Sequence, residues 1–203
     1  MTEETKEKVN LLKRDFRAMM NGPVSVSLRE KGLNYRVIFG VEWPRLVDLA
    51  RGMEKNHDLA QALWKEDIRE CRLLAGLLQP VETFFPEIAD IWVESMRYPE
   101  EAQYTVMSLF QHLPYASDKA FEWIAGQHPM FQLCGWLLMA RLFMRGVPLN
   151  RQSEDEFVDQ AEAALASDDP LLRRTVRNAV YKYALVGERE KLRVGKILEA
   201  CNF

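Results

Sequence analysis

Between residues 38 and 78, three successive segments carry apolar residues at every third or fourth position, and this pattern constrains the fold more than any other feature of the chain. The last segment has five such residues: Ile68, Leu73, Leu74, Leu77 and Leu78. Residues at this spacing share one face of an α-helix, so each segment buries one stripe and leaves a polar face. The stretch therefore predicts helices packed on helices.

Prolines and glycines divide the rest of the chain into further helical segments, because proline is favoured in the first turn of a helix and glycine just after the last. The β-branched runs are short, so no strand is expected. Helices are expected at residues 3–20, 25–31, 43–52, 57–65, 67–79, 86–96, 99–112, 118–126, 129–145, 154–166, 170–185 and 188–200. Ser117, Ser153 and Asp169 are expected at helix N-termini, with Ser153 and Glu156 forming a capping box.

The helices are spaced as pairs. The second helices of successive pairs begin near residues 67, 99, 129 and 170, so the spacings are 32, 30 and 41 residues. A period of this length predicts an array in which each pair buries its apolar face against the next. The expected fold class is all-α: a superhelical stack of HEAT-like antiparallel helix pairs (an α-solenoid) that forms a single domain over residues 1–203. The polar faces of the second helices are expected to line a concave surface.

Composition indicates where such a chain resides. Hydrophobic residues make up 48% and charged residues 28%, as in an ordinary soluble globular protein. The longest apolar stretch, residues 131–144, is interrupted by Gln132 and Arg141, so no membrane span is expected. The N-terminus has no apolar signal core. The three cysteines are odd in number and widely spaced: Cys71, Cys134 and Cys201. A reducing, cytoplasmic location is therefore expected, without a disulfide scaffold.

The charge distribution is uneven. The net charge of −3 is unlike that of a dedicated DNA-binding protein, which is usually basic because phosphate contacts supply most of the affinity. Residues 173–196, however, contain eight Lys and Arg against two Glu, a local charge of +6, so the rest of the chain carries −9. This basic segment indicates an anionic partner. The alternative is a solvated helical face.

The stretch from residue 38 to 78 resembles the DNA alkylation repair (AlkD-type) family of HEAT-like helical proteins. That family has the pattern Gly-(Val/Ile)-x-x-Pro, then a Leu-Trp pair, then a helix that bears Glu and Arg and ends in Leu-Leu. The matching residues here are Gly40, Val41, Pro44, Leu63, Trp64, Glu70, Arg72, Leu77 and Leu78. The resemblance implies a HEAT-like fold, and a partner in duplex DNA, from which the family removes positively charged alkylated bases.

The resemblance also locates the family's catalytic set, which is an acidic residue with two tryptophans and a supporting arginine. Such a carboxylate stabilises the positive charge that develops on the sugar as the glycosidic bond breaks. The family's Ser-Trp-Trp-Asp-x-x-Asp segment corresponds to residues 95–101, where both tryptophans are replaced and the catalytic aspartate falls on or near Glu101. The position of the family's arginine is occupied here by Leu133, and the position of a tryptophan in the penultimate-helix motif is occupied by Asn178. Glu101 is therefore the catalytic candidate, although a carboxylate in a first helical turn also fits a capping role.

The penultimate helix carries the strongest binding candidate. Arg174, Asn178 and Tyr181 recur at spacings of four and three residues, so they share one face. Neighbouring cations flank this face. The predicted nucleic-acid-binding residues are Arg173, Arg174, Arg177, Asn178, Tyr181 and Lys182. Arginine, amide and phenol groups contact phosphates and sugars. The alternative is an exposed face whose arginines pair with glutamates of the neighbouring helix.

Other site chemistries have little support in the sequence. His57, His112 and His128 lack the spacing of metal ligands, so no metal or other cofactor is expected. Four tryptophans lie among apolar neighbours and are expected in the core: Trp64, Trp92, Trp123 and Trp136. Trp43 is expected to be partly exposed.

Three functions from different classes remain open at this stage. The first is a DNA alkylation repair-like protein that binds DNA without normal alkylpurine glycosylase activity, which the basic segment favours. The second is a helical scaffold for a protein partner, which the acidic total favours. The third is an active glycosylase that uses Glu101, which the retained carboxylate favours.

Overall fold

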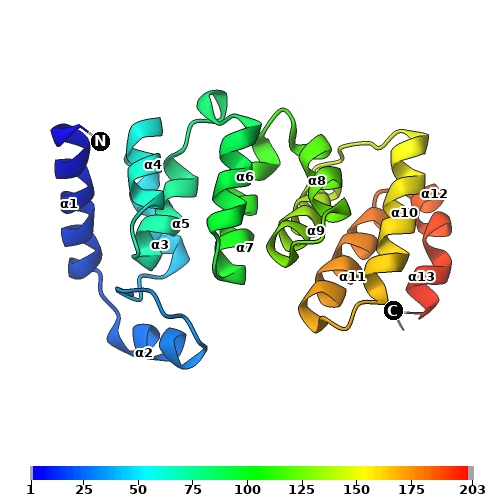
Figure 1. The fold of residues 1–203 in the computed structure, drawn as a ribbon, viewed down its shortest axis with the longest axis horizontal. Coiled ribbons are helices and arrows are strands. Elements are labelled where there is room, and N and C mark those ends of the chain that lie inside the picture. The colour runs from blue at the N-terminus through cyan, green and yellow to red at the C-terminus, as the bar shows by residue number, and fades with distance from the viewer. Residues whose placement is uncertain (1, 201–203) are drawn as a thin grey trace. The chain divides into compact units, whose positions relative to one another are not determined.

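The computed structural model describes residues 2–200, and this part of the chain is helical throughout, without a β-strand (Figure 1). It contains thirteen α-helices and two short 3-10 helices. An isolated parallel bridge joins Val37 to Ile68. The helices fall into two compact units, divided between Trp92 and Val93. The single domain over residues 1–203 stays a prediction.

The N-terminal unit contains the first six helices. Their bounds are α1 Glu3–Ala18, α2 Gly22–Glu30, α3 Trp43–Arg51, α4 His57–Trp64, α5 Arg69–Leu78 and α6 Pro86–Ser95, with the division between the units inside α6, and the 3-10 helix Val81–Thr83 precedes α6. Helix α5 packs against α3 and α4, and α4 packs against α1. Almost every residue of α5 is buried, so it is the central helix of this unit.

Two stacked tryptophans and an arginine pack together in the core of the N-terminal unit. The rings of Trp64 and Trp92 are stacked with centroids 4.0 Å apart and planes inclined by 2°. The Arg72 guanidinium lies 4.3 Å from the Trp64 ring. The Trp92 indole donates to Gln61 at 3.1 Å. Cation–π contact and hydrogen bonding together explain how a buried arginine and a buried indole are accommodated here.

The segment around Gly40 is fixed by a buried carboxylate. Glu70 is fully buried, and its oxygens accept hydrogen bonds from the backbone N–H groups of Phe39, Gly40 and Val41 at 3.1, 2.9 and 3.2 Å. Gly40 has φ 77°, and a Cβ there would lie 2.3 Å from the Asn21 carbonyl oxygen. The conformation and the close approach of α2 therefore both require glycine.

The C-terminal unit contains the remaining helices. Their bounds are α7 Pro99–Ser108, α8 Ala116–Ala125, α9 Pro129–Met144, α10 Arg151–Leu165, α11 Pro170–Ala184, α12 Glu188–Arg193 and α13 Gly195–Ala200, and the 3-10 helix Phe110–His112 follows α7. Helix α9 packs against α7, α8 and α11. A Cβ on Gly135 would lie 2.6 Å from the Ile124 side chain, so glycine allows α8 and α9 to pack closely.

The helix positions expected from the sequence agree with the structure apart from their ends. The expected helix at 188–200 is two helices, α12 and α13. The N-cap of α8 is Tyr115, not Ser117, and that of α10 is Asn150, not Ser153. The Asn150 side chain accepts from the Ser153 N–H at 2.9 Å, so this end of the helix is still capped by a side chain. Asp169 caps α11 as expected, accepting from Leu171 N–H at 2.8 Å.

The tryptophans lie where the sequence placed them. The four that were expected in the core are buried: Trp64, Trp92, Trp123 and Trp136. Trp43, at the start of α3, is half-buried, as expected. The four buried tryptophans therefore belong to the core and not to a binding surface.

Candidate nucleic-acid interface

Helix α11 presents one buried and one exposed face. Its buried residues are Leu172, Thr175, Val176, Ala179, Val180, Tyr183 and Ala184, and the helix packs against α9 and α10. Positions three and four residues apart on the other side form a continuous exposed stripe. The stripe consists of Leu171, Arg174, Asn178, Tyr181 and Leu185. The apolar periodicity of the sequence was thus sufficient to orient this helix.

The six residues predicted to bind nucleic acid differ in exposure. Arg174, Arg177, Asn178 and Tyr181 are exposed. Arg173 is half-buried, and its guanidinium donates to the Ser167 carbonyl oxygen at 2.7 Å, which ties it to the loop before the helix. The structure therefore places four of the six on the open surface.

Lys182 belongs to the edge of this surface. It is half-buried, and its ammonium lies 5.8 Å from the centroid of the Tyr181 ring. A cation over an aromatic face is attracted by the ring quadrupole, so this contact orients both side chains.

Two arginines of α11 carry uncompensated charge. Neither Arg174 nor Arg177 forms an ion pair with any residue between 2 and 200. Arg177 also borders a shallow hollow of about 370 Å³, together with Glu162, Leu165, Lys196, Ile197 and Ala200 from α10 and α13. Unpaired guanidinium groups on an open face can bind anionic oxygens in bidentate fashion.

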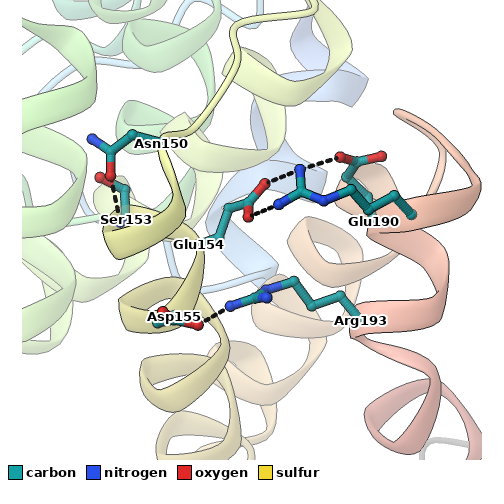
Figure 2. Close-up of polar contacts among 7 residues, drawn as sticks. Asn150, Ser153, Glu154, Asp155, Glu190 and Arg193 are labelled. Carbon is teal, nitrogen blue, oxygen red and sulfur yellow. Dashed lines mark hydrogen bonds and ion pairs between the residues drawn. The ribbon is translucent and has the colours of Figure 1, made fainter.

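The arginines of α12 have a different role from those of α11. Arg189 forms ion pairs with Glu154 of α10 and with Glu190, the two carboxylates labelled in Figure 2. Glu154 is buried, and its two oxygens accept from Arg189 at 3.0 and 2.5 Å. Arg193 forms a second ion pair between α12 and α10, through one oxygen of the exposed Asp155 side chain. The basic segment of residues 173–196 is therefore not one cationic surface, because its α12 arginines neutralise acids of α10.

This ion-pair cluster affects a neighbouring phenol. Tyr183 is buried, and burial, followed by the adjacent Glu154 carboxylate, raises the pKa of its hydroxyl above the ordinary value. The Tyr183 ring packs against Phe143 and Phe157, with both centroids at 5.0 Å. The cluster thus joins α9, α10, α11 and α12 within the C-terminal unit.

Replacement of Arg189 by alanine is expected to speed amide hydrogen exchange in α12, because buried Glu154 loses its cationic partner. Lys191→Ala is the matched control. Its pair with Glu188 is exposed at both ends, with N and O 3.9 Å apart, so exchange should change little. Equal exchange rates in the wild type and the Arg189 variant would show that the pair does not hold α12.

Glu101, the catalytic candidate, lies at the first turn of α7. Its side chain is fully buried, and one carboxylate oxygen accepts from the backbone N–H groups of Arg97 and Tyr98 at 2.6 and 3.3 Å. This is the glutamate half of a capping box, with Pro99 as the first helical residue. The geometry assigns the carboxylate a structural contact, and its catalytic role stays a prediction.

Sequence and structural comparisons place the chain among known proteins. A sequence model of the family described as DNA alkylation repair enzyme matches residues 12–184. The chain belongs to this family. A search of curated proteins found no match.

A solved structure has a similar fold to this member of the DNA alkylation repair family. It is described as belonging to a new family of proteins related to the HEAT-like repeat DNA glycosylases, with affinity for branched DNA structures. The two chains are 13% identical, with a TM-score of 0.78, and the match covers 92% of this chain and 78% of the other. The expected fold class, all-α and HEAT-like, is confirmed. The concave groove lined by second helices stays a prediction.

In this member of the family, the positions expected to correspond to the catalytic set lie in different environments, and that correspondence stays a prediction. Leu133, on α9, is buried in the core, whereas Asn178 is exposed on α11. At the start of α7, the Arg97 guanidinium lies 5.5 Å from the Tyr98 ring. A cation–π pair therefore lies in residues 95–101, the segment that the resemblance aligns with the family's two tryptophans.

A second cationic cluster was not identified from the sequence. It lies in the N-terminal unit, where Lys13, Arg14 and Arg17 of α1 border the same hollow as Arg36. The spacing of Arg14 and Arg17, three residues apart in one helix, could have predicted that the two arginines share a face. The sequence could not predict that Arg36, which lies in a loop nineteen residues after Arg17, would border the same hollow.

The described residues contain neither a membrane-spanning helix nor a group of three potential metal ligands. None of the helices within residues 2–200 is long and apolar enough to cross a membrane. No cluster of three or more His, Cys, Asp or Glu side chains in that range could hold a metal ion. Cys71 and Cys134 are buried thiols outside any disulfide, and burial raises the pKa of each. Cys201 lies outside the described residues.

Proposed function

We propose that this protein binds duplex DNA through the exposed face of α11 and does not excise alkylated purines in the manner of its family. The observation that carries the proposal is the uncompensated charge of Arg174 and Arg177 beside exposed Asn178 and Tyr181. Membership of the DNA alkylation repair family supports DNA as the partner. So does the described affinity of a structurally similar protein for branched DNA.

The proposed contacts are to the phosphate backbone. Arginines release condensed counterions when they neutralise phosphates, while an amide and a phenol hydrogen-bond to phosphate or sugar oxygens. Such contacts fix the position of the protein on the duplex without reading its sequence. The proposed binding is therefore weak, independent of sequence and strongly dependent on salt.

The non-catalytic half of the proposal rests on Glu101. Its carboxylate has no exposed surface and is bonded to two backbone N–H groups. A catalytic carboxylate must come within hydrogen-bond reach, about 2.6–3.2 Å, of the atoms it acts on. A sugar could reach Glu101 only if the first turn of α7 opened, and that opening would remove the cap.

The test is duplex affinity measured against salt concentration. Replacement of Arg174 and Arg177 together by alanine is expected to reduce the slope of log K against log salt by roughly 2 units, at about 0.9 per phosphate contact. The matched control replaces Arg145 and Arg151, which are also exposed and lie in the same unit but outside α11. An equal reduction in both double variants would mean that net charge alone matters and would refute the α11 assignment.

A protein partner is the second candidate function. The α11 stripe ends in apolar residues, Leu171 with 37% and Leu185 with 61% of the side chain exposed, and exposed apolar residues are typical of protein contacts. The salt titration separates the two candidates. If the wild type binds no duplex at low salt, the protein partner becomes the favoured function.

A further inference from the structure

The cationic hollow of the N-terminal unit is formed by three segments of chain. It has a volume of about 370 Å³. The residues around it are Lys13, Arg14 and Arg17 of α1, Arg36, Val37 and Phe39 of the loop after α2, and Glu66, Asp67 and Ile68 before α5. We call it the α1 hollow. It lies within the N-terminal unit and uses no residue of the α11 face.

The apolar side of the α1 hollow is held by buried contacts. Val37 pairs with the segment before α5 through two backbone hydrogen bonds, to the Asp67 oxygen at 3.3 Å and from the Arg69 N–H at 3.2 Å. The backbone N–H of Phe39 donates a hydrogen bond to the Glu70 carboxylate, and the Phe39 ring packs against Phe16 with centroids 6.0 Å apart. The apolar side of the hollow is therefore anchored to the core of the unit.

The charges around the α1 hollow are unevenly compensated. Lys13 is paired with Glu66 at 2.8 Å, and both side chains are 29% exposed. Arg14, Arg17 and Arg36 are exposed and form no ion pair with any residue from 2 to 200. With Asp67 included, the residues around the hollow carry a net charge of +2. Three guanidinium groups beside one hollow repel each other, and a bound anion would relieve that repulsion.

From this arrangement we infer that the α1 hollow binds a nucleotide that bears a terminal phosphate. Guanidinium forks match phosphate oxygens in bidentate geometry. A phosphomonoester carries a charge of about −1.5 to −2 at neutral pH, more than the single charge of a backbone diester, so a cluster of three arginines favours the monoester. The apolar side formed by Val37, Phe39 and Ile68 leaves room for sugar or base contact.

The size of the α1 hollow limits the ligand. Its volume lies at the lower end of the roughly 300–1,000 Å³ typical of small-ligand sites. It therefore has room for one phosphate-bearing nucleotide, either free or at the end of a strand. The same chemistry is offered by the phosphorylated end of a nucleic-acid strand and by a free nucleoside monophosphate, and the experiment below has an arm for each.

The first arm compares fluorescent oligonucleotide duplexes that differ only in a terminal phosphate or hydroxyl group, with 5′ and 3′ phosphates tested separately. Binding is measured by anisotropy. A phosphorylated end is expected to bind about tenfold more tightly, as one additional charge-assisted contact would give. The second arm titrates adenosine monophosphate against adenosine by calorimetry. A preference for the phosphorylated compound in either arm supports the site and identifies its source.

Variants of the protein test whether the preference for a phosphorylated ligand arises at the α1 hollow. Replacement of Arg14, Arg17 and Arg36 together by alanine is expected to abolish this preference. The matched control replaces Lys6, Lys8 and Lys31, three exposed cations of the same unit, and should retain it. No phosphate preference in either arm, a preference that survives in the arginine variant, or its loss in the lysine control would each overturn the inference.

The same experiment distinguishes this inference from the proposed function. Removal of Arg174 and Arg177 should weaken binding of phosphorylated and unphosphorylated duplexes alike and leave their ratio unchanged. If the wild type binds no duplex at all, the DNA-binding function of α11 fails, while the adenosine monophosphate arm still decides the α1 hollow.

Discussion

Replacement of Glu70 by alanine is expected to lower the free energy of unfolding by about 3 kcal/mol or more, because it leaves three backbone N–H groups buried without an acceptor, each at a cost of about 1–3 kcal/mol. These are the N–H groups of Phe39, Gly40 and Val41, all within 3.2 Å of a Glu70 oxygen. The loss is large against the total stability of a typical domain, about 5–15 kcal/mol. Urea unfolding followed by circular dichroism measures it.

Two further variants make the Glu70 result specific. Glu70→Gln keeps one acceptor oxygen, so its effect should be smaller than that of alanine. Glu66→Ala removes the same charge four residues earlier, from a part-exposed pair with Lys13, and should cost less than about 1 kcal/mol. If Glu70→Ala and Glu66→Ala were equally mild, water or a rearranged loop would be satisfying the N–H groups, and the buried carboxylate would not be what fixes this turn.

The Glu70 contact also explains the most recognisable part of the sequence. Gly40, Val41 and Glu70 all belong to the pattern by which the sequence resembles the DNA alkylation repair family. The structure shows them as one unit, in which a buried carboxylate binds a turn that only glycine can form. A sequence pattern can reveal each residue, but not the contact between positions thirty residues apart. The fold therefore accounts for these three residues of the pattern.

The helices could be predicted because their signals are local. Apolar spacing and proline positions located every α-helix, although the expected 188–200 helix is divided between α12 and α13. The cap of α10 was misplaced because Asn150 and Ser153 are both good N-cap residues. The structure begins the helix three residues earlier, at Arg151, and Glu154 near its start pairs with Arg189. A tertiary ion pair across thirty-five residues thus accompanies the local choice.

The candidate site was only partly predictable for the same reason. Periodicity was enough to show that Arg174, Asn178 and Tyr181 share a face, and that face is exposed. It could not separate these residues from Arg189 and Arg193, which lie in the same basic run but pair with acids of α10. Charge counted along a sequence includes cations that are already neutralised in the fold. The α1 hollow shows the converse, since Arg36 joins the cations of α1 from a separate segment that shares no sequence pattern with that helix.

Replacement of Glu101 by glutamine is expected to lower the stability of the C-terminal unit by about 1–3 kcal/mol and to change no catalytic rate. The Glu101 carboxylate is buried and accepts hydrogen bonds from two backbone N–H groups at the start of α7. The amide of glutamine can replace these hydrogen bonds only in part. Glu100→Gln is the matched control, because it removes the same charge from the adjacent position without removing the cap. Urea unfolding of the three proteins measures this part of the prediction.

The catalytic part is measured by single-turnover release of 7-methylguanine from alkylated duplex DNA. The wild type and Glu101→Gln are both expected to match the spontaneous loss of this labile base, because residues 95–101 contain no tryptophan and the Glu101 carboxylate has no exposed surface. Rapid release by the wild type that disappears in a folded Glu101→Gln protein, but not in Glu100→Gln, would refute the non-catalytic proposal. It would mean that α7 opens at its first turn when DNA binds and that the capping carboxylate then reaches the sugar. Fast hydrogen exchange of the Arg97 and Tyr98 amides on DNA binding would reveal that opening independently.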